Sequence, residues 1–384
     1  MMGKPKIRFK GYNEDWEQRK LDDWGNFYYG RSCPKWSVAE DATIPCIRYG
    51  ELYTKFGAKI DKIYSYTNMS PENLRFSNGT EVLIPRVGED PMDYNRCTWL
   101  SMPNVAIGEM ISVFNTDNNP LFTATMFNAT LQHEFAMRVE GGSVTNLYFD
   151  KLKNIEVSFP TKEEQEKIAT YFDHLDHLIT LHQHKCDEMK KLKKYMLQKM
   201  FPQNGKKVPE IRFDGFTNDW EQRKLSDVVD SVDTGKSKFD KEGSSGEYPI
   251  LGSTSVIGYD AEYDYEGDFI LTARVGANAG SLYRHAGKVK ISDNTVFIQA
   301  SQNIEFLYQL LIRFDIKRLS FGTGQPLVKA SELKRLELMM PTDMEEQMRI
   351  GVYFKNLDHL ITLHQHKCDE LQNLKKYMLQ NMFV

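Results

Sequence analysis

The stretch LDHLITLHQHKCDE runs from Leu175 to Glu188 and recurs without change from Leu357 to Glu370. Around it, residues 171–201 match residues 353–383, with most mismatches at polar positions. In each copy an apolar, His or Cys residue recurs at steps of four and three, the spacing of a coiled-coil seam. The seam positions of the first copy are Ile168, Phe172, Leu175, Ile179, His182, Cys186 and Met189. Two such copies in one chain predict two long helices that can pair.

We expect the helices to pair through Phe172, Leu175, Ile179, His182 and Cys186 of the first copy and through Phe354, Leu357, Ile361, His364 and Cys368 of the second. His182 then acts as a polar seam residue that fixes the register, and His184 is solvated. The alternative is a zinc site, because His and Cys four residues apart share a helix face and an antiparallel partner brings His364 and Cys368 close. We favour the register role and predict no metal site.

The same signals precede both helices. Pro160-Thr161 with Glu164, and Pro341-Thr342 with Glu345, predict capping boxes in which the Thr hydroxyl and the Glu carboxylate bind free backbone N–H groups. Further upstream, residues 6–24 (KIRFKGYNEDWEQRKLDDW) return as residues 210–228 (EIRFDGFTNDWEQRKLSDV). The chain is therefore a tandem of two half-molecules, each with a repeated leading segment and a repeated closing helix.

Between the repeats lie two modules, residues 25–159 and residues 229–340, which barely resemble each other. Both contain short apolar runs punctuated by Gly, Asn and Asp, which is typical of strands joined by turns. A few landmarks align, and they are 44–47 with 248–251, 86–88 with 274–276, and 141–145 with 322–326. We therefore expect an α+β fold in which the two modules share a scaffold and differ in their loops.

Charge and cysteine usage narrow the class of protein. A net charge of -4 and a pI near 6.2 argue against a simple nucleic-acid binder, which usually carries a clearly basic domain. The five cysteines are widely spaced without a CxxC pair, which indicates reduced thiols in a cytoplasm. The polar N-terminal stretch is not a signal peptide, and no apolar run approaches the length of a membrane span. We expect a cytoplasmic protein that does not bind a membrane.

The motifs that suggest catalysis are incomplete. Residues 233–237 (DTGKS) end like a phosphate-binding loop, but Asp230 stands where that motif has its first glycine, so a polar turn is the better interpretation. His133-Glu134 lacks the second histidine of a zinc protease, because residue 137 is Met. We predict no catalytic residue and no cofactor site in this chain.

Candidate DNA contacts lie in the aligned loops. Arg86 and Arg274 follow strands and precede a Val-Gly pair, where a guanidinium can reach guanine or phosphate; the alternative is a strand-end salt bridge. Gln325, with Thr323, lies in the stretch FGTGQP, where a glycine-flanked amide can pair with adenine. Thr145 holds the matching place in the first half. Flanking loops supply three further candidates, Asn278, Arg284 and Arg48.

Several of these features occur together in one known family. They are WEQRKL at 16–21 and 220–225, the helix openings FPTKEEQEKI and MPTDMEEQMRI, the Asp-x-x-Ile continuations at 176–179 and 358–361, and the doubled helix. Each motif is short, but their duplicated order around unlike modules is specific. In this arrangement the whole chain resembles the specificity (S) subunit of Type I restriction-modification systems.

The resemblance implies a division of the chain. It places target-recognition domain 1 at residues 1–160, a central conserved helix at 161–201, a linker at 202–209, target-recognition domain 2 at 210–341 and a C-terminal conserved helix at 342–384. In that family the two helices form an antiparallel coiled coil that separates the recognition domains in a pseudo-two-fold tandem repeat. Each recognition domain reads one half of a bipartite, asymmetric site in double-stranded DNA, and the helices set the spacer.

The resemblance also implies partners. The subunit has no catalysis of its own, and its helices dock two modification (methyltransferase) subunits, which bring S-adenosylmethionine and methylate adenine. Two restriction subunits add translocation and cleavage with ATP and Mg. Two alternatives remain: a structural adaptor that carries two domains on a coiled-coil strut without binding DNA, and an enzyme with a tandem catalytic domain. The second is disfavoured, because duplicated catalytic domains should keep matching chemical residues and these halves do not.

Overall fold

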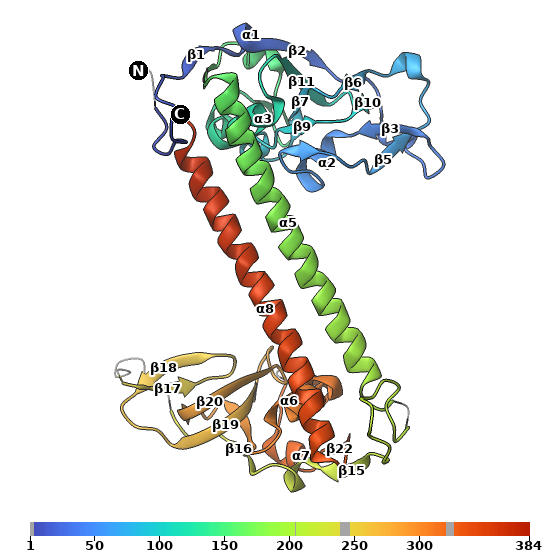
Figure 1. The fold of residues 1–384 in the computed structure, drawn as a ribbon, viewed down its shortest axis with the longest axis vertical. Coiled ribbons are helices and arrows are strands. Elements are labelled where there is room, and N and C mark those ends of the chain that lie inside the picture. Colours follow the sequence, from blue (N-terminus) through green and yellow to red (C-terminus); the bar gives the residue numbers. More distant parts are fainter. Residues whose placement is uncertain (1–3, 204, 239–245, 320–325) are drawn as a thin grey trace. The chain divides into compact units, whose positions relative to one another are not determined.

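The computed structural model describes residues 4–203, 205–238, 246–319 and 326–384 (Figure 1). The chain divides into two compact units, unit 1 with residues 1–181 and 367–384 and unit 2 with residues 182–366. Two helices of 38 residues each, α5 (Lys162–Lys199) and α8 (Met344–Asn381), contribute to both units. The two long helices and the α+β class predicted from the repeat are therefore confirmed.

The first module, in unit 1, is built on a five-stranded sheet of order β2-β11-β7-β9-β4 and a four-stranded sheet of order β5-β3-β10-β6. Two smaller sheets have the orders β12-β13-β8 and β1-β14. The strands are β1 (Glu17–Lys20), β2 (Gly25–Tyr29), β3 (Ile44–Ile47), β4 (Lys59–Ile60), β5 (Ser65–Thr67), β6 (Phe76–Asn78), β7 (Glu81–Pro85), β8 (Val87–Gly88), β9 (Thr98–Leu100), β10 (Pro103–Ile107), β11 (Ile111–Thr116), β12 (Glu140–Gly141), β13 (Thr145–Asn146) and β14 (Glu156–Phe159). The short helices are α1 (Leu21–Trp24), α2 (Tyr49–Thr54), α3 (Pro120–Thr130) and α4 (Gln132–Ala136).

The second module, in unit 2, has one six-stranded sheet of order β16-β21-β19-β20-β17-β18 and a separate pair, β15-β22. Its strands are β15 (Glu221–Lys224), β16 (Ser231–Thr234), β17 (Tyr248–Leu251), β18 (Val256–Asp260), β19 (Tyr265–Ala273), β20 (Leu282–Ile291), β21 (Thr295–Gln299) and β22 (Glu337–Met340). Its helices are α6 (Ile304–Phe314) and α7 (Ala330–Lys334). Three of the short apolar runs that predict strands, at 81–87, 268–275 and 295–300, do lie in or next to strands β7, β19 and β21.

The two modules pair equivalent strands despite their unlike sequences. In the first, β3 runs parallel to β10 with Ile47 opposite Ile107; in the second, β17 runs parallel to β20 with Leu251 opposite Ile291. The N–H of Leu147 donates to the carbonyl of Arg86 at 2.8 Å, and the N–H of Val328 donates to that of Arg274 at the same distance. These contacts agree with the first two aligned landmarks, so the modules share a scaffold.

The repeated leading segment pairs with the strand that enters each long helix. Strand β1 is antiparallel to β14, and β15 is antiparallel to β22. In each half an arginine of the leading segment forms a bidentate ion pair with a buried glutamate of the long helix. Arg8 donates two hydrogen bonds of 2.7 Å to Glu164, and Arg212 donates two of 2.7 and 2.8 Å to Glu346. The side chains of Glu164 and Glu346 are 0% and 1% exposed. The repeated Arg and Glu thus fasten each leading segment to the start of its long helix.

The capping-box prediction is confirmed for α5 only in its Thr161 half and is wrong for α8. The N–H of Glu164 donates to the Thr161 hydroxyl at 3.4 Å. At α8 the N–H of Glu345 donates to the Asp343 carboxylate at 2.8 Å, so Asp343 and not Thr342 caps that helix. Asp343 holds the place of Thr161 once the two glutamates that bind arginine are aligned. Because Glu164 is bound to Arg8, its carboxylate does not complete a capping box.

The long helices pack against each other in each unit. In unit 1 the rings of Phe172 and Phe383 stack with centroids 5.8 Å apart, and Lys375 forms an ion pair with Asp176. Phe172 and Leu175 are both buried in the core of this unit, with Leu371. Figure 1 shows α5 and α8 side by side in this unit.

In unit 2 the paired residues show the direction of packing. The Nδ1 atoms of His182 and His364 lie 3.0 Å apart, the Cys186 thiol lies 3.8 Å from the Ile361 carbonyl oxygen, and Lys193 donates to Asp358 at 2.6 Å. The partner numbers fall as the α5 numbers rise, so the helices are antiparallel. Within this unit Phe354 and Leu357 are buried with Met200 and Phe201, and Cys368, in unit 1, is also buried.

Phenylalanines just beyond the C-terminal ends of the long helices complete the aromatic cores. In unit 1 Phe383 packs against Trp16 and Phe122, and in unit 2 Phe201 packs against Trp220 and Phe306. The N–H of Ile7 donates to the carbonyl of Asn381, and the N–H of Ile211 to that of Lys199, each at 2.9 Å. Each module is therefore closed by the end of the helix that enters from the other half of the sequence. Among the described residues, no helix is long and apolar enough to cross a membrane.

Candidate nucleic-acid interface

Arg86 and Arg274 occupy equivalent places in the two modules. Arg86 follows β7, and its Nη1 donates to the carbonyl of Glu109 at 3.3 Å; Arg274 follows β19, and its Nη1 donates to the carbonyl of Asp293 at 3.4 Å. Glu109 lies in the turn between β10 and β11, and Asp293 lies in the turn between β20 and β21. The described contacts of both arginines include no ion pair, so the strand-end salt bridge is absent there.

The surroundings of the two arginines differ. The Arg86 guanidinium lies 4.5 Å from the ring centroid of Tyr29 and 5.4 Å from that of Tyr148, and the residue is half-buried. Arg274 is exposed. The two tyrosine rings limit the directions that Arg86 can take, whereas within the described residues the Arg274 side chain is held by its contact with the Asp293 carbonyl.

A repeated loop next to these arginines was not recognised in the sequence. Gly30-Arg31-Ser32 follows β2, and Gly235-Lys236-Ser237 follows β16. The Ser32 carbonyl accepts the N–H of Glu109 at 2.9 Å, and the Ser237 carbonyl accepts that of Asp293 at 3.1 Å. The signal was a shared Gly-basic-Ser triplet after the first strand of each module. The prediction that DTGKS is a polar turn is wrong in part: Asp233 and Thr234 end β16, and residues 235–237 form the loop that follows, with a counterpart in the other module.

Thr145 lies inside the first module. It is 6% exposed, its hydroxyl donates to the Gly88 carbonyl at 3.1 Å, and the Tyr94 hydroxyl lies 3.0 Å from it. These contacts occupy the Thr145 hydroxyl, which the sequence predicted to contact DNA. Gln325 and Thr323, at the matching place in the second half, lie outside the described residues.

The remaining candidates have mixed surroundings. Arg284 forms an ion pair with Glu305, and its guanidinium lies 4.6 Å from the ring centroid of Tyr308, so its charge is engaged within unit 2. Arg48 precedes α2, and its N–H donates to Glu51 at 2.8 Å. Asn278 is exposed in the loop between β19 and β20, and its carbonyl accepts the N–H of Ser281 at 2.9 Å.

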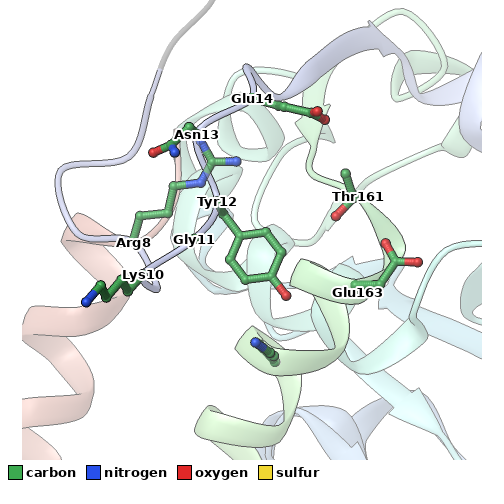
Figure 2. A pocket seen from close by; sticks show the side chains of 9 residues that line it. Arg8, Lys10, Gly11, Tyr12, Asn13, Glu14, Thr161 and Glu163 are labelled. Atoms are coloured by element: carbon green, nitrogen blue, oxygen red, sulfur yellow. The ribbon is translucent and has the colours of Figure 1, made fainter.

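An open pocket lies where the leading segment meets the start of α5 (Figure 2). Arg8, Tyr12 and Glu163 line it, but Arg8 is paired with Glu164, and Lys167 lies 5.0 Å from the Tyr12 ring centroid. Unit 2 repeats the last contact, with Arg349 over the ring of Phe216 at 5.3 Å. The pocket therefore belongs to the repeated frame and not to the variable loops.

The zinc alternative is not supported in the described part of the chain. No group of three or more His, Cys, Asp or Glu side chains there is arranged to hold a metal ion. His182 faces His364, while Cys186 approaches the Ile361 carbonyl and the Gln365 amide oxygen at 3.6 Å. His184 is exposed, as predicted.

Both halves of this repeated frame match one family of known proteins. The chain matches the Type I restriction modification DNA specificity domain twice, over residues 13–191 and over residues 217–373. It belongs to this family. The specificity-domain family supplies the DNA specificity component of Type I enzymes and not a catalytic subunit, so the resemblance predicted from the sequence is confirmed.

Individual relatives support the assignment to the specificity-domain family. The chain is 26% identical over 262 residues to the Type I restriction enzyme MjaVIII specificity subunit of Methanocaldococcus jannaschii, a match covering 59% of this chain and 61% of that protein. It is 25% identical over 115 residues to the EcoprrI specificity subunit of Escherichia coli, covering 29% and 28% of the two chains. The matched regions thus span about three fifths and less than a third of these relatives.

A solved structure supports the fold. The Type I restriction-modification S subunit from M. genitalium has a TM-score of 0.71 with this chain, with 16% sequence identity and coverage of 100% and 99% of the two chains. At this identity the likeness concerns the fold alone, which is the specificity-domain family's arrangement of two modules with packed α5 and α8.

Proposed function

We propose that this chain is the DNA sequence-recognition subunit of a Type I restriction-modification complex, in which each module reads one half of a bipartite, asymmetric site. The observation that carries the proposal is the combination of a repeated frame with unlike modules. Two modules on one scaffold with different loops suit two different half-sites. The paired helices set the spacer between the half-sites, and they carry no chemistry of their own.

Equivalent docking surfaces for two copies of one partner support this proposal. Each unit exposes two leucines of one helix and a leucine and a tyrosine of the other, between 37% and 55% exposed. The set is Leu178, Leu181, Leu374 and Tyr377 in unit 1 and Leu360, Leu363, Leu192 and Tyr195 in unit 2. Exposed apolar groups at matching places are expected where two copies of one protein bind.

The partners follow from the family. Two modification subunits bind these surfaces and bring S-adenosylmethionine for adenine methylation, and two restriction subunits bring ATP and Mg for translocation and cleavage. The substrate of the assembly is double-stranded DNA in the cytoplasm. This chain selects the sequence, and the catalytic residues belong to its partners.

The mild acidity of the chain suggests that the modification subunits carry much of the phosphate binding. This can be tested by measuring specific duplex binding by this chain with and without its modification subunit. We expect tight specific binding by the complex and weak binding by the chain alone. Tight specific binding by the isolated chain would contradict this part of the proposal.

The decisive experiment maps methylated adenines in DNA from cells that express this chain with its modification partner. We expect one split, asymmetric sequence. Replacing residues 229–340 by the corresponding module of another specificity subunit should change one half of that sequence and leave the other. A change in both halves would contradict independent reading, and the absence of sequence-selective methylation would favour the DNA-independent adaptor.

A further inference from the structure

In each module two basic residues are held on one turn, and we call this arrangement a cationic corner. It consists of Arg31 and Arg86 in the first module and of Lys236 and Arg274 in the second. In the first, the turn at residues 108–110 binds Arg86 through the Glu109 carbonyl and binds the loop of Arg31 through the Glu109 N–H. In the second, the turn at residues 292–294 binds Arg274 and the loop of Lys236 through the corresponding groups of Asp293. One residue of each turn thus joins, through its backbone N–H and C=O, two basic segments that are far apart in the sequence.

The loops are pressed tightly onto these turns. The Gly30 N–H donates to the Ile111 carbonyl at 3.0 Å, and the Gly235 N–H donates to that of Thr295 at 2.9 Å. A Cβ added at Gly30 would clash with the Gly108 carbonyl oxygen, and one at Gly235 would clash with that of Ser292. Only glycine allows this approach, so the backbone that carries each basic residue is fixed.

The charges of the corners remain available. Arg31, Lys236 and Arg274 are exposed, and no ion pair involves them or Arg86 among the described residues. Ion pairs do engage comparable cations nearby, such as Arg284 with Glu305 and Lys290 with Asp260. In each corner two basic segments meet at one turn residue, and among the described residues neither the turn carboxylates of Glu109 and Asp293 nor any other acid forms an ion pair with these cations. Each corner can therefore offer its charge to an anionic ligand.

We propose that each cationic corner binds a phosphate of the DNA backbone, with Arg31 and Lys236 supplying the free charge beside Arg86 and Arg274. This inference rests on the proposed function. The two modules differ in sequence almost everywhere, as readers of different half-sites must. A device kept in both must contact something that both half-sites share, and the sugar-phosphate backbone is that common element. The corners therefore position each module on the duplex, and other loops read the bases.

The test uses the assembled complex of this chain with its modification subunits and the variants Arg31→Gln, Lys236→Gln and the double variant. Binding constants are measured from 50 to 200 mM salt on a duplex with the methylated sequence and on an unrelated duplex. Removing one phosphate contact should reduce the magnitude of the slope of log K against log salt by about 0.9. Between 50 and 200 mM salt, the factor by which each single variant loses affinity should therefore be roughly 3.5 times smaller than the factor for the wild type. Both duplexes should weaken by the same factor, and the methylated sequence should not change.

Matched controls come from the repeated frame. Lys20 on β1 and Lys224 on β15 are exposed and equivalent to each other, and Lys20→Gln and Lys224→Gln should keep the wild-type slope. The charge-keeping variants Arg31→Lys and Lys236→Arg should restore it, which separates loss of charge from loss of folding.

Three outcomes separate the possibilities. A wild-type slope in Arg31→Gln and Lys236→Gln would overturn the phosphate contact, and so would a methylated sequence altered at one base pair, because that marks a base reader. If the wild-type complex neither binds DNA in a salt-dependent way nor methylates a defined sequence, the proposed function fails, and the corners fail with it.

Discussion

Replacing Glu346 by Gln should destabilise unit 2 far more than replacing its neighbour Glu345 by Gln. Glu346 is 1% exposed and binds Arg212, itself 11% exposed, through two hydrogen bonds of 2.7 and 2.8 Å. Breaking a buried ion pair by removing one partner costs about 3–5 kcal/mol, because the remaining charge stays buried without a partner of opposite sign. Glu345 is 61% exposed in its pair with Arg349, and such surface pairs contribute about 0.3–0.5 kcal/mol.

Thermal unfolding of the two single variants measures the difference. In a unit of this size, 1 kcal/mol shifts Tm by about 2–4 °C, so Glu346→Gln should lower the unit 2 transition by roughly 6 °C or more. Glu345→Gln should lower it by at most about 2 °C on the same scale. Replacing both Glu346 and Arg212 by apolar residues of similar volume should recover much of the loss. Equal shifts in the two single variants would refute the view that these pairs fasten the leading segments to the long helices.

Three further predictions concern the helix seam and a buried thiol. Lys193→Glu should lower Tm by placing like charges at 2.6 Å spacing, and adding Asp358→Lys should restore it; no recovery would contradict the pairing. Replacing His182 and His364 by Leu should raise the urea midpoint, since polar seam residues cost stability, whereas a lower midpoint would show that the His contact stabilises. Burial raises the pKa of the Cys97 thiol, so native protein should resist iodoacetamide there at pH 8 by mass spectrometry, and urea should expose it.

The long helices and the repeated frame were predictable because their signals are local and occur twice. The seam pattern of a long helix can be recognised within one continuous segment, and its recurrence in a second segment shows that the pattern did not arise by chance. The cap of α8 was misplaced because Thr342 precedes Asp343, and the choice depends on which glutamate the distant Arg212 binds. Sequence spacing alone could not supply that contact.

The recognition loops were harder to predict because their contacts are made between distant segments. Thr145 follows two glycines and a serine, which suggests an exposed loop, yet Tyr94 covers its hydroxyl. Arg284 is engaged by Glu305 from α6, which follows later in the chain. The Gly-basic-Ser triplets are too short to be significant until the turns holding them are known. The sequence does not show which side of each loop faces solvent.

The exchange of helix ends has a consequence for fragments. Because Phe383 packs against Trp16 and Phe122, a polypeptide that ends at residue 203 lacks the ring that completes the aromatic core of its own module. The same fragment carries Phe201, whose local sequence matches that of Phe383 and which fills the corresponding socket of the other half. We therefore expect two such fragments to pair as a homodimer in which each Phe201 fills the aromatic socket of the other fragment.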